Sequence, residues 1–214
     1  MSLQAAEFKH ILRKIAGRIE EESDYLSELD RKIGDGDHGV TMVIGWTAII
    51  DKLNELEEEN DLGIILKSIA MSFLNAVGAS VGPLYGRAFL RGSMVAKDKI
   101  ELNHEEIVKF WSAAVTAIVE LGNAEVGDKT MVDTWIPIMR SLESSFEQGT
   151  EWLASLDLAV NAGEQGMNST KDMVPQKGRS SRLGERAQGH IDPGAASAFI
   201  IFSTFVEAYK QLRA

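Results

Sequence analysis

Three aspartates near the start of the chain have the residue types and spacing of a divalent-cation site. Asp30, Asp35 and Asp37 stand at positions i, i+5 and i+7, and Gly34 and Gly36 allow the chain between them to turn sharply. In a tight turn the three carboxylates converge, and two carboxylates about 4 Å apart repel by roughly 4 kcal/mol at an effective dielectric near 20. A divalent cation removes that repulsion, and oxygen-only ligands favour Mg²⁺, Ca²⁺ or Mn²⁺ over Zn²⁺.

Two better-known loop motifs do not account for this segment. A calcium-binding EF-hand loop requires a glutamate at its twelfth position, and counted from Asp35 that position is Trp46. Gly34, Gly36 and Gly39 spell G-x-G-x-x-G, but a dinucleotide-binding motif follows a strand, whereas the preceding residues have a helical pattern. Mg²⁺ shared between the chain and phosphate oxygens is the preferred interpretation, and a capped turn without a ligand is the alternative.

Other glycine-rich segments interrupt the helical pattern at 78–86, 122–130 and 178–194. Loops of a helical protein gather at its ends, so several special loops predict a site built at one end. Residues 177–186, here called the lid segment, hold four cations in an acidic chain, which favours a phosphate-binding lid over a merely solvated loop. Residues 192–194 open the last helix, whose free N–H groups could also hold phosphate.

The elements that position these loops are predicted to be helices throughout. Apolar residues recur at helical spacing in six stretches, and no alternating run bounded by turn signals indicates a strand. Each apolar face must be buried against other helices. We therefore expect an all-α fold, with residues 1–214 forming one domain, a bundle or closed ring of about eight amphipathic helices.

Composition narrows the functional class. The chain has 214 residues, 44% of them hydrophobic and 25% charged, as in an ordinary globular domain. It contains no cysteine, which excludes thiolate chemistry and favours a cytoplasmic location. The formal net charge of −10 argues against nucleic-acid binding. The residues after Met1 show no signal-peptide pattern, and no apolar run is long enough to predict a membrane span.

Taken together and in order, the motifs resemble those of the L subunits of dihydroxyacetone kinases. They span nearly the whole chain, and the set is far more specific than any one of them. The matching segments are LD at 29–30, GDGDHG at 34–39, GPLYG at 82–86, GDKTMVD at 127–133, KGR at 177–179, LGER at 183–186, GH at 189–190 and DPGA at 192–195.

The resemblance implies a barrel of eight antiparallel helices that binds ADP or ATP at one end. It implies that Asp30, Asp35 and Asp37 hold two Mg²⁺ ions that bridge the phosphates, and that Arg179 lies near the transferred phosphoryl group. The residues that it places around the nucleotide are His38, Gly39, Thr41, Ala79, Ser80, Gly122, Thr130, Met131, Arg179, Asp192, Pro193 and Gly194.

The activity implied is phosphoryl transfer from the nucleotide to a small ketose, held by a separate K-type subunit. An M-type subunit would rephosphorylate bound ADP in systems fed by phosphoenolpyruvate, whereas other systems use ATP directly. Two departures bear on this: Thr41 stands where many members have asparagine, and Arg182 where tyrosine is common. A nucleotide-loaded protein that docks a transcription regulator, and a magnesium-dependent phosphohydrolase, are the alternative functions.

Overall fold

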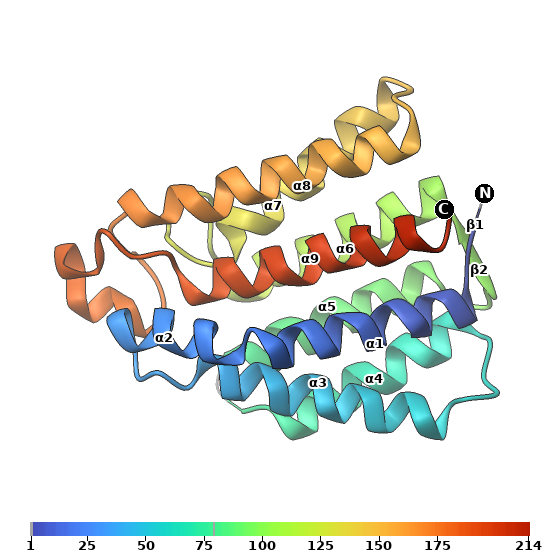
Figure 1. The fold of residues 1–214 in the computed structure, drawn as a ribbon, viewed down its shortest axis with the longest axis horizontal. Helices are drawn as coiled ribbons and strands as arrows, with labels where there is room; N and C mark the ends of the chain where they lie inside the picture. The colour runs from blue at the N-terminus through green and yellow to red at the C-terminus, as the bar shows by residue number, and fades with distance from the viewer. Residues whose placement is uncertain (1, 79) are drawn as a thin grey trace.

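The computed structural model describes residues 2–78 and 80–214, with the side chain of Arg179 outside that description. Within these residues the chain forms nine α-helices, two short 3-10 helices and one pair of short strands (Figure 1). The α-helices are α1 (Ala5–Glu21), α2 (Ser23–Ile33), α3 (His38–Glu55), α4 (Leu62–Ala76), α5 (Val81–Val95), α6 (His104–Gly122), α7 (Val132–Glu147), α8 (Trp152–Ser169) and α9 (Pro193–Gln211). The 3-10 helices are η1 (Thr170–Asp172) and η2 (Arg179–Ala187).

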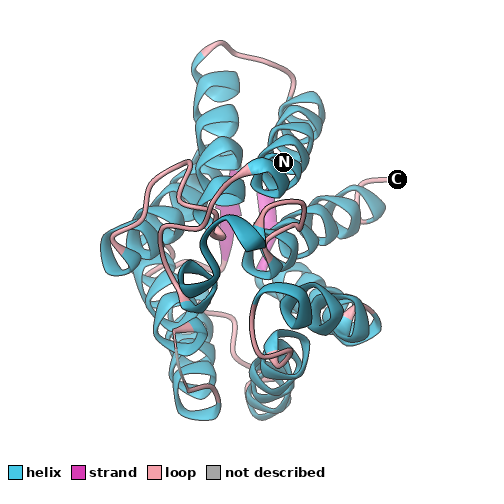
Figure 2. Cartoon of the chain, turned by 90° about the vertical axis from the view of Figure 1, so that its left-hand side faces the viewer, coloured by secondary structure: helices cyan, strands magenta, loops and turns pink. Residues whose placement is uncertain are grey.

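The long helices form a closed ring, as predicted. Contacts run from α1 to α3, α4, α5, α6 and α7 in turn, and α9 joins α7 and α8 back to α1. Figure 2, which looks at the molecule from the left of Figure 1, shows the helices end-on around a common interior. Eight long helices build the barrel, and the short helix α2 lies at its left-hand end in Figure 1, beside the lid segment. No helix within the described residues is long and apolar enough to cross a membrane.

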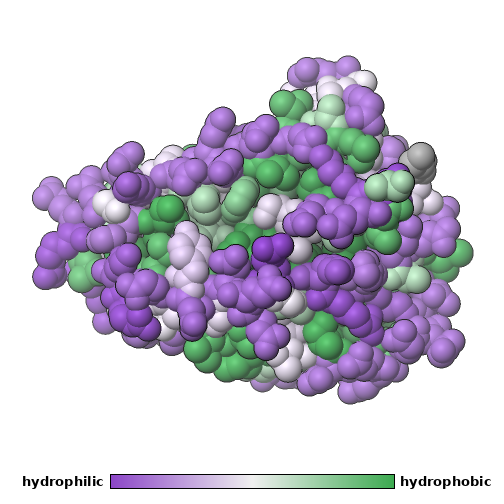
Figure 3. All heavy atoms as spheres, viewed as in Figure 1, coloured by the Kyte–Doolittle hydropathy of each residue, from purple (hydrophilic) through white to green (hydrophobic). Residues whose placement is uncertain are grey.

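The interior of the ring is filled by the apolar faces that the periodicity indicated. Trp111 of α6 lies at the centre, with its ring stacked 5.4 Å from that of Trp135 and edge-on to Phe202 and Phe205 of α9. These contacts tie three helices together across the barrel and give a close-packed core. Figure 3 shows polar side chains over most of the outer face, with separate apolar patches between them.

Two details differ from the sequence-based expectation. β1 (Ser2–Gln4) pairs antiparallel with β2 (Glu101–Asn103), although no strand was predicted. Strands of three residues are too short to show an alternating pattern, and their partners are far apart in the sequence. Phe146 lies at helical spacing from Ile138 and Leu142, which predicts a buried side chain, yet it is 40% exposed. The α7–α8 hairpin extends past the neighbouring helices there (Figure 1), and Phe146 lies on the exposed side of the last turn, next to the buried Ser145.

Capping residues fix where several helices begin. At the start of α6 the Asn103 side chain accepts a hydrogen bond from the Glu106 amide at 2.9 Å, and the Glu106 carboxylate accepts one from the Asn103 amide at 2.8 Å. This reciprocal pair satisfies two amides that the helix itself cannot. Because β2 ends where α6 begins, the cap also fixes the direction in which α6 enters the barrel.

Candidate metal and nucleotide site

The aspartate loop connects α2 to α3 at the open end of the barrel. Asp30 lies in the last turn of α2, and its Oδ2 accepts hydrogen bonds from the amides of Asp37 at 2.9 Å and His38 at 3.2 Å. Gly36 has φ +80°, a conformation that a residue with a Cβ rarely adopts. At Gly34 a Cβ would collide with the Asp30 carboxylate. The two glycines therefore allow the loop to fold back onto Asp30.

This fold brings the three predicted metal ligands together. One carboxylate oxygen from each of Asp30, Asp35 and Asp37 lies within 4.8 Å of the others. Asp30 is buried, whereas Asp35 and Asp37 face solvent at the pocket mouth. An oxygen-only set that is open on one side suits Mg²⁺, which binds a few carboxylates and completes its coordination with phosphate and water. The residues present therefore fit the implied metal.

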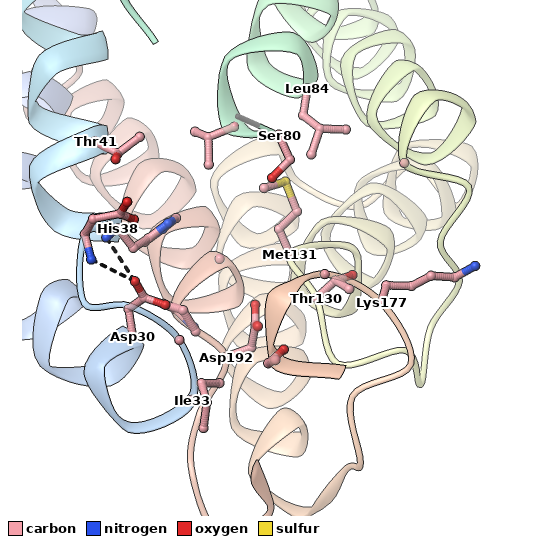
Figure 4. Close-up of a pocket in the computed structure, with 18 of the residues that line it drawn as sticks. Asp30, Ile33, His38, Thr41, Ser80, Leu84, Thr130, Met131, Lys177 and Asp192 are labelled. Atoms are coloured by element: carbon pink, nitrogen blue, oxygen red, sulfur yellow. Dashed lines mark hydrogen bonds between the residues drawn. The ribbon is translucent and has the colours of Figure 1, made fainter. Parts of the chain in front are cut away.

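A pocket of about 480 Å³ lies beside the three carboxylates. This size is within the range of small-molecule and cofactor sites. Its walls come from five places: the aspartate loop with the start of α3, the turn between α4 and α5, the loop between α6 and α7, the lid segment and the start of α9 (Figure 4). The barrel thus gathers at one end the loops that the sequence marked as unusual.

Acidic and apolar surfaces occupy different parts of this pocket. Asp30 stands on the α2–α3 side, whereas Leu84 and Met131 lie on the other side of the pocket, near Ser80 (Figure 4). Val77 and Ile118 add further apolar side chains to the lining. Met131 is a polarisable side chain that packs well against flat rings. A ligand with a charged end and a flat apolar end matches this division.

His38, the first residue of α3, is held as a neutral ring. Its Nε2 lies 2.9 Å from Ser197 Oγ, and the Ser197 hydroxyl donates to the Gly194 carbonyl at 3.1 Å. Because that hydroxyl has one proton, Nε2 is assigned as the protonated ring nitrogen. Burial lowers the pKa of His38 to about 4, although nearby Asp30 opposes the shift. His38 therefore joins α3 to α9 as a hydrogen-bonding group and carries no positive charge near neutral pH.

Asp192 caps α9 from inside the protein. Its Oδ2 accepts a hydrogen bond from the Ala195 amide at 2.8 Å, and its own amide donates to Thr170 Oγ1 at 3.0 Å. Pro193 occupies the first turn of α9, where its missing N–H costs nothing. Burial raises the pKa of Asp192 to about 7, against the opposing effects of the Ala195 hydrogen bond and the Lys129 charge.

The α6–α7 loop is organised by Asp133, which the sequence analysis did not single out as a site residue. Its carboxylate accepts hydrogen bonds from the amides of Gly127 at 2.6 Å and Thr130 at 2.7 Å. Burial raises the pKa of Asp133, although these hydrogen bonds oppose the shift. Thr130 Oγ1 accepts a hydrogen bond from the Val132 amide at 3.1 Å, although Met131, and not Thr130, is the N-cap residue of α7.

The structure collects nearly all the predicted binding residues at this pocket. Its lining includes the predicted residues Asp30, Asp35, Asp37, His38, Thr41, Ser80, Gly122, Thr130, Met131, Asp192, Pro193 and Gly194. Gly39 is placed elsewhere: a Cβ there would collide with the Ser23 carbonyl, so it allows α3 to pack closely on α2. Ala79 and the side chain of Arg179 lie outside the described residues.

The lid segment includes all but the last residue of the 3-10 helix η2, which packs against α2. Lys177, Gly178 and Ser180 reach the pocket wall. Lys129 also lines the pocket and was missed as a site residue, because its place in the glycine-rich loop suggested an exposed side chain. The one signal that could have found it is its position beside Asp128 and Thr130 in a loop already linked to the site.

Comparisons with known proteins agree with this arrangement. The ADP-binding subunit DhaL of the PEP-dependent dihydroxyacetone kinase of Escherichia coli (strain K12) is 37% identical over 211 residues, covering 99% of this chain and 100% of that protein. The ADP-binding subunit DhaL of the PTS-dependent dihydroxyacetone kinase of Lactococcus lactis subsp. lactis (strain IL1403) is 38% identical over 196 residues, covering 92% and 93% of the two chains.

A solved structure shares the fold. The crystal structure of the dihydroxyacetone kinase from C. freundii, in complex with AMP-PNP and Mg²⁺, superposes with a TM-score of 0.72 at 22% identity, over 97% of this chain and 34% of that one. The family model described as the DAK2 domain matches residues 32–207, a span that includes all but the first aspartate of the cluster and every loop of the pocket. The chain therefore belongs to the DAK2 domain family.

Proposed function

We propose that the protein is the nucleotide-binding phosphoryl-transfer subunit of a kinase for dihydroxyacetone or a related small ketose. The observation that carries this proposal is the convergence of three carboxylates at the mouth of a pocket with an apolar far wall. The full-length similarity to ADP-binding subunits of dihydroxyacetone kinases supports it. In this proposal residues 1–214 act as a single nucleotide-binding domain.

Asp30, Asp35 and Asp37 are the proposed metal ligands, with Mg²⁺, in two ions, as the metal and ADP or ATP as the nucleotide. When bound, Mg²⁺ would neutralise charge between the phosphates and hold them in line. The chain contributes the rest of the positioning. The start of α9 lines the pocket, but the free N–H groups expected there from the sequence are taken up. The amides of Ala195 and Ala196 donate to Asp192, and Pro193 has no N–H. Thr41 and Ser80 add hydroxyl groups to the lining.

The transferred group is proposed to leave the nucleotide beneath the lid segment. Arg179 belongs to that segment, and we assign it the role of stabilising negative charge as the transition state forms. His38 is neutral, so its part is to keep α3 and α9 in register and to present a polar edge to the ligand. The protein would work by positioning and electrostatics, with no covalent nucleophile of its own.

The acceptor site lies on another protein in this proposal. The pocket here combines an acidic mouth with apolar lining residues, an arrangement that suits a nucleotide. A K-type subunit would therefore present the ketose at the mouth, in the cytoplasm, and an M-type subunit would restore the phosphoryl group where phosphoenolpyruvate is the donor. The acidic net charge of −10 gives no support to nucleic acid as a partner.

Calorimetry on a variant with Asp35→Ala and Asp37→Ala tests the site. We expect the wild-type protein to bind Mg–ADP and the variant to lose measurable binding, because two of three carboxylates are removed. A charge-matched control carries Glu58→Ala and Asp98→Ala, two exposed acids away from the pocket, and should bind like wild type. Undiminished binding by the first variant rejects the assignment.

Reconstitution tests the activity. The purified chain, mixed with a K-type subunit, a small ketose and a phosphoryl donor, should produce the ketose phosphate. The same mixture with the double aspartate variant should not. A wild-type protein that binds nucleotide tightly but transfers nothing would instead favour the regulatory function.

A further inference from the structure

Lys129 is a fully buried cation at the root of the lid segment. It is 0% exposed, although it lies in a loop between helices, and its φ of +61° is unusual for a residue with a long side chain. We propose that Lys129 is a positioning residue that holds together the two stretches of chain on either side of the lid segment, residues 170–171 and 189–192. These two stretches, the arms, are together called the stem, and the lid segment moves while the stem stays fixed. The contacts of Lys129 do not depend on the proposed function, but the expected effect on nucleotide affinity rests on it.

The ammonium group of Lys129 bridges the two arms directly. Its Nζ donates hydrogen bonds to the Thr170 carbonyl, before the lid segment, and to the His190 carbonyl, after it. These two residues are far apart along the chain, yet one side chain from a third segment holds both. Hydrogen bonds from a charged donor are stronger than those between neutral groups. The clamp therefore fixes the separation of the two arms.

Other hydrogen bonds close the same stem around Lys129. The Gly189 amide donates to the Lys171 carbonyl at 2.8 Å, and the Asp192 amide donates to Thr170 Oγ1 at 3.0 Å. The residue before Lys129 takes part as well, since the Gln176 amide donates to the Asp128 carbonyl at 3.0 Å. The α6–α7 loop thus grips the chain on both sides of the lid segment.

The lid segment itself has the features of a part that can change conformation. Gly178 and Gly184 have φ of +72° and +57°, and Lys177 and Ser180 lie at the pocket wall. Arg182 and Arg186 are exposed. Within the described residues, the backbone hydrogen bonds and the Lys129 contacts that join this part of the chain to other segments lie at the stem. A stem that stays fixed and a tip, residues 180–186, that moves about its glycines together form a small lid.

The charge environment explains why a lysine can be buried here. Burial lowers the pKa of Lys129, and the carboxylates of Asp192, Asp133 and Asp172 oppose that shift. These acids favour the ammonium form that both carbonyls need as donor. Removing the ammonium would take away the donor that joins the Thr170 and His190 carbonyls and leave Thr170 only the Met173 amide, so the stem would open more often. Nucleotide binding would then have to close the stem as well as the lid, and its apparent affinity would fall.

Hydrogen exchange on the ligand-free protein tests the clamp without reference to any function. In a Lys129→Met variant we expect the Gly189 and Asp192 amides to exchange at least about tenfold faster than in wild type. The matched control is Lys9→Met. Lys9 is 5% exposed and donates to the carbonyls of Leu56 at 3.1 Å and Glu59 at 3.0 Å, outside the pocket. Lys9→Met should leave stem exchange unchanged, and equal exchange in wild type and Lys129→Met overturns the proposal.

Mg–ADP binding tests the consequence. Lys129→Met should raise the dissociation constant in inverse proportion to the fraction of molecules whose stem stays closed, by about tenfold if one molecule in ten keeps it closed. Adding nucleotide should slow tryptic cleavage after Lys177, Arg182 and Arg186. The slowing should be smaller in Lys129→Met than in Lys9→Met. Loss of most of the protection of the stem amides with an unchanged dissociation constant would overturn the positioning role. A wild-type protein that binds no Mg–ADP would contradict the proposed function, while the exchange result would still decide the clamp.

The wild-type protein provides a measurement that does not depend on a variant that folds. The amides of Gly189 and Asp192 should be strongly protected, whereas amides of residues 180–186 should exchange much faster. That difference is expected if the tip moves on a fixed stem. Equal protection of stem and tip would mean that the whole segment opens together, which overturns the proposal.

Discussion

The two ends of the barrel use charged side chains in opposite ways. At the end with the chain termini, Arg213 donates to both carboxylate oxygens of Glu7, at 2.8 and 3.0 Å, and to the Ser2 carbonyl at 2.7 Å. Its guanidinium also lies 4.6 Å from the centre of the Tyr209 ring. At the other end, three carboxylates come within 4.8 Å of one another. One end joins opposite charges, and the other gathers like charges.

The comparison separates stability from function. A partly buried arginine with a two-pronged carboxylate partner holds the first helix to the last and closes the ring. Like charges at the mouth repel one another, and a cation bound between them relieves that repulsion. The protein therefore gathers acids where a cation can bind, and pairs opposite charges where its two termini meet.

The largest effect should follow from Asp30→Ala. This change removes a proposed metal ligand and also the acceptor for the amides of Asp37 and His38, so the loop loses its shape. We expect Mg–ADP affinity to fall by about a hundredfold or more, measured by calorimetry. Asp24→Ala, an exposed acid on the same helix, is the control and should bind like wild type. A loss below tenfold would mean that Asp30 shapes the loop without binding metal.

Arg213→Met, at the end of the barrel with the chain termini, should lower stability instead of nucleotide affinity. The free energy of unfolding should fall by about 2 kcal/mol, between the values for exposed and fully buried ion pairs. Mg–ADP affinity should not change. Denaturant unfolding measures the free energy of unfolding. The control is Lys97→Met, which should leave that free energy almost unchanged because Lys97 is 77% exposed. An equal loss of nucleotide affinity in Arg213→Met would show that the two ends are coupled.

The ring and the metal cluster were predictable because each follows from short-range pattern. Apolar spacing identifies the buried face of each helix, and it placed residues such as Trp111 and Phe202 in the core. The glycines at 34 and 36 allow the turn that brings Asp35 and Asp37 back to Asp30. The aspartates of the cluster are close in sequence, and the packing of apolar faces in the ring requires no specific partner.

The polar contacts between distant segments could not be predicted. Lys129 finds the carbonyls of Thr170 and His190, and β1 finds β2, only after the barrel has closed. A hydrogen bond depends on positions accurate to a few tenths of an ångström, and periodicity gives no such information. Charged residues in a glycine-rich loop are usually solvated, so a buried Lys129 contradicts the ordinary expectation for its type.

Asp192→Asn should change how stability depends on pH. The pKa of Asp192 is raised from 3.8 to about 7 by burial, so between these values the folded protein keeps a proton that the unfolded chain has lost. The free energy of unfolding should therefore fall as pH rises through this window, by at most about 1.4 kcal/mol per pH unit for one proton. Asparagine retains the oxygen that caps α9 and should flatten the slope. Denaturant unfolding at several pH values measures the slope of the free energy of unfolding against pH, with Asp172→Asn as the control. An unchanged slope in Asp192→Asn would assign the effect to other groups.

His104 at the opposite end should give a smaller effect of the opposite sign. Its ring stacks on Trp152 at 4.3 Å, and burial lowers its pKa below 6.5, assisted by the Arg213 charge. Below pH 6.5 the unfolded chain then binds a proton more readily than the folded protein does, so acid should destabilise the fold through this residue. His104→Gln should reduce that acid sensitivity, whereas His10→Gln, at an exposed histidine, should not. The effect should be weaker than that of Asp192, because His104 is only partly buried. If His104→Gln instead altered stability equally at all pH values, the stacking contact would matter and the charge would not.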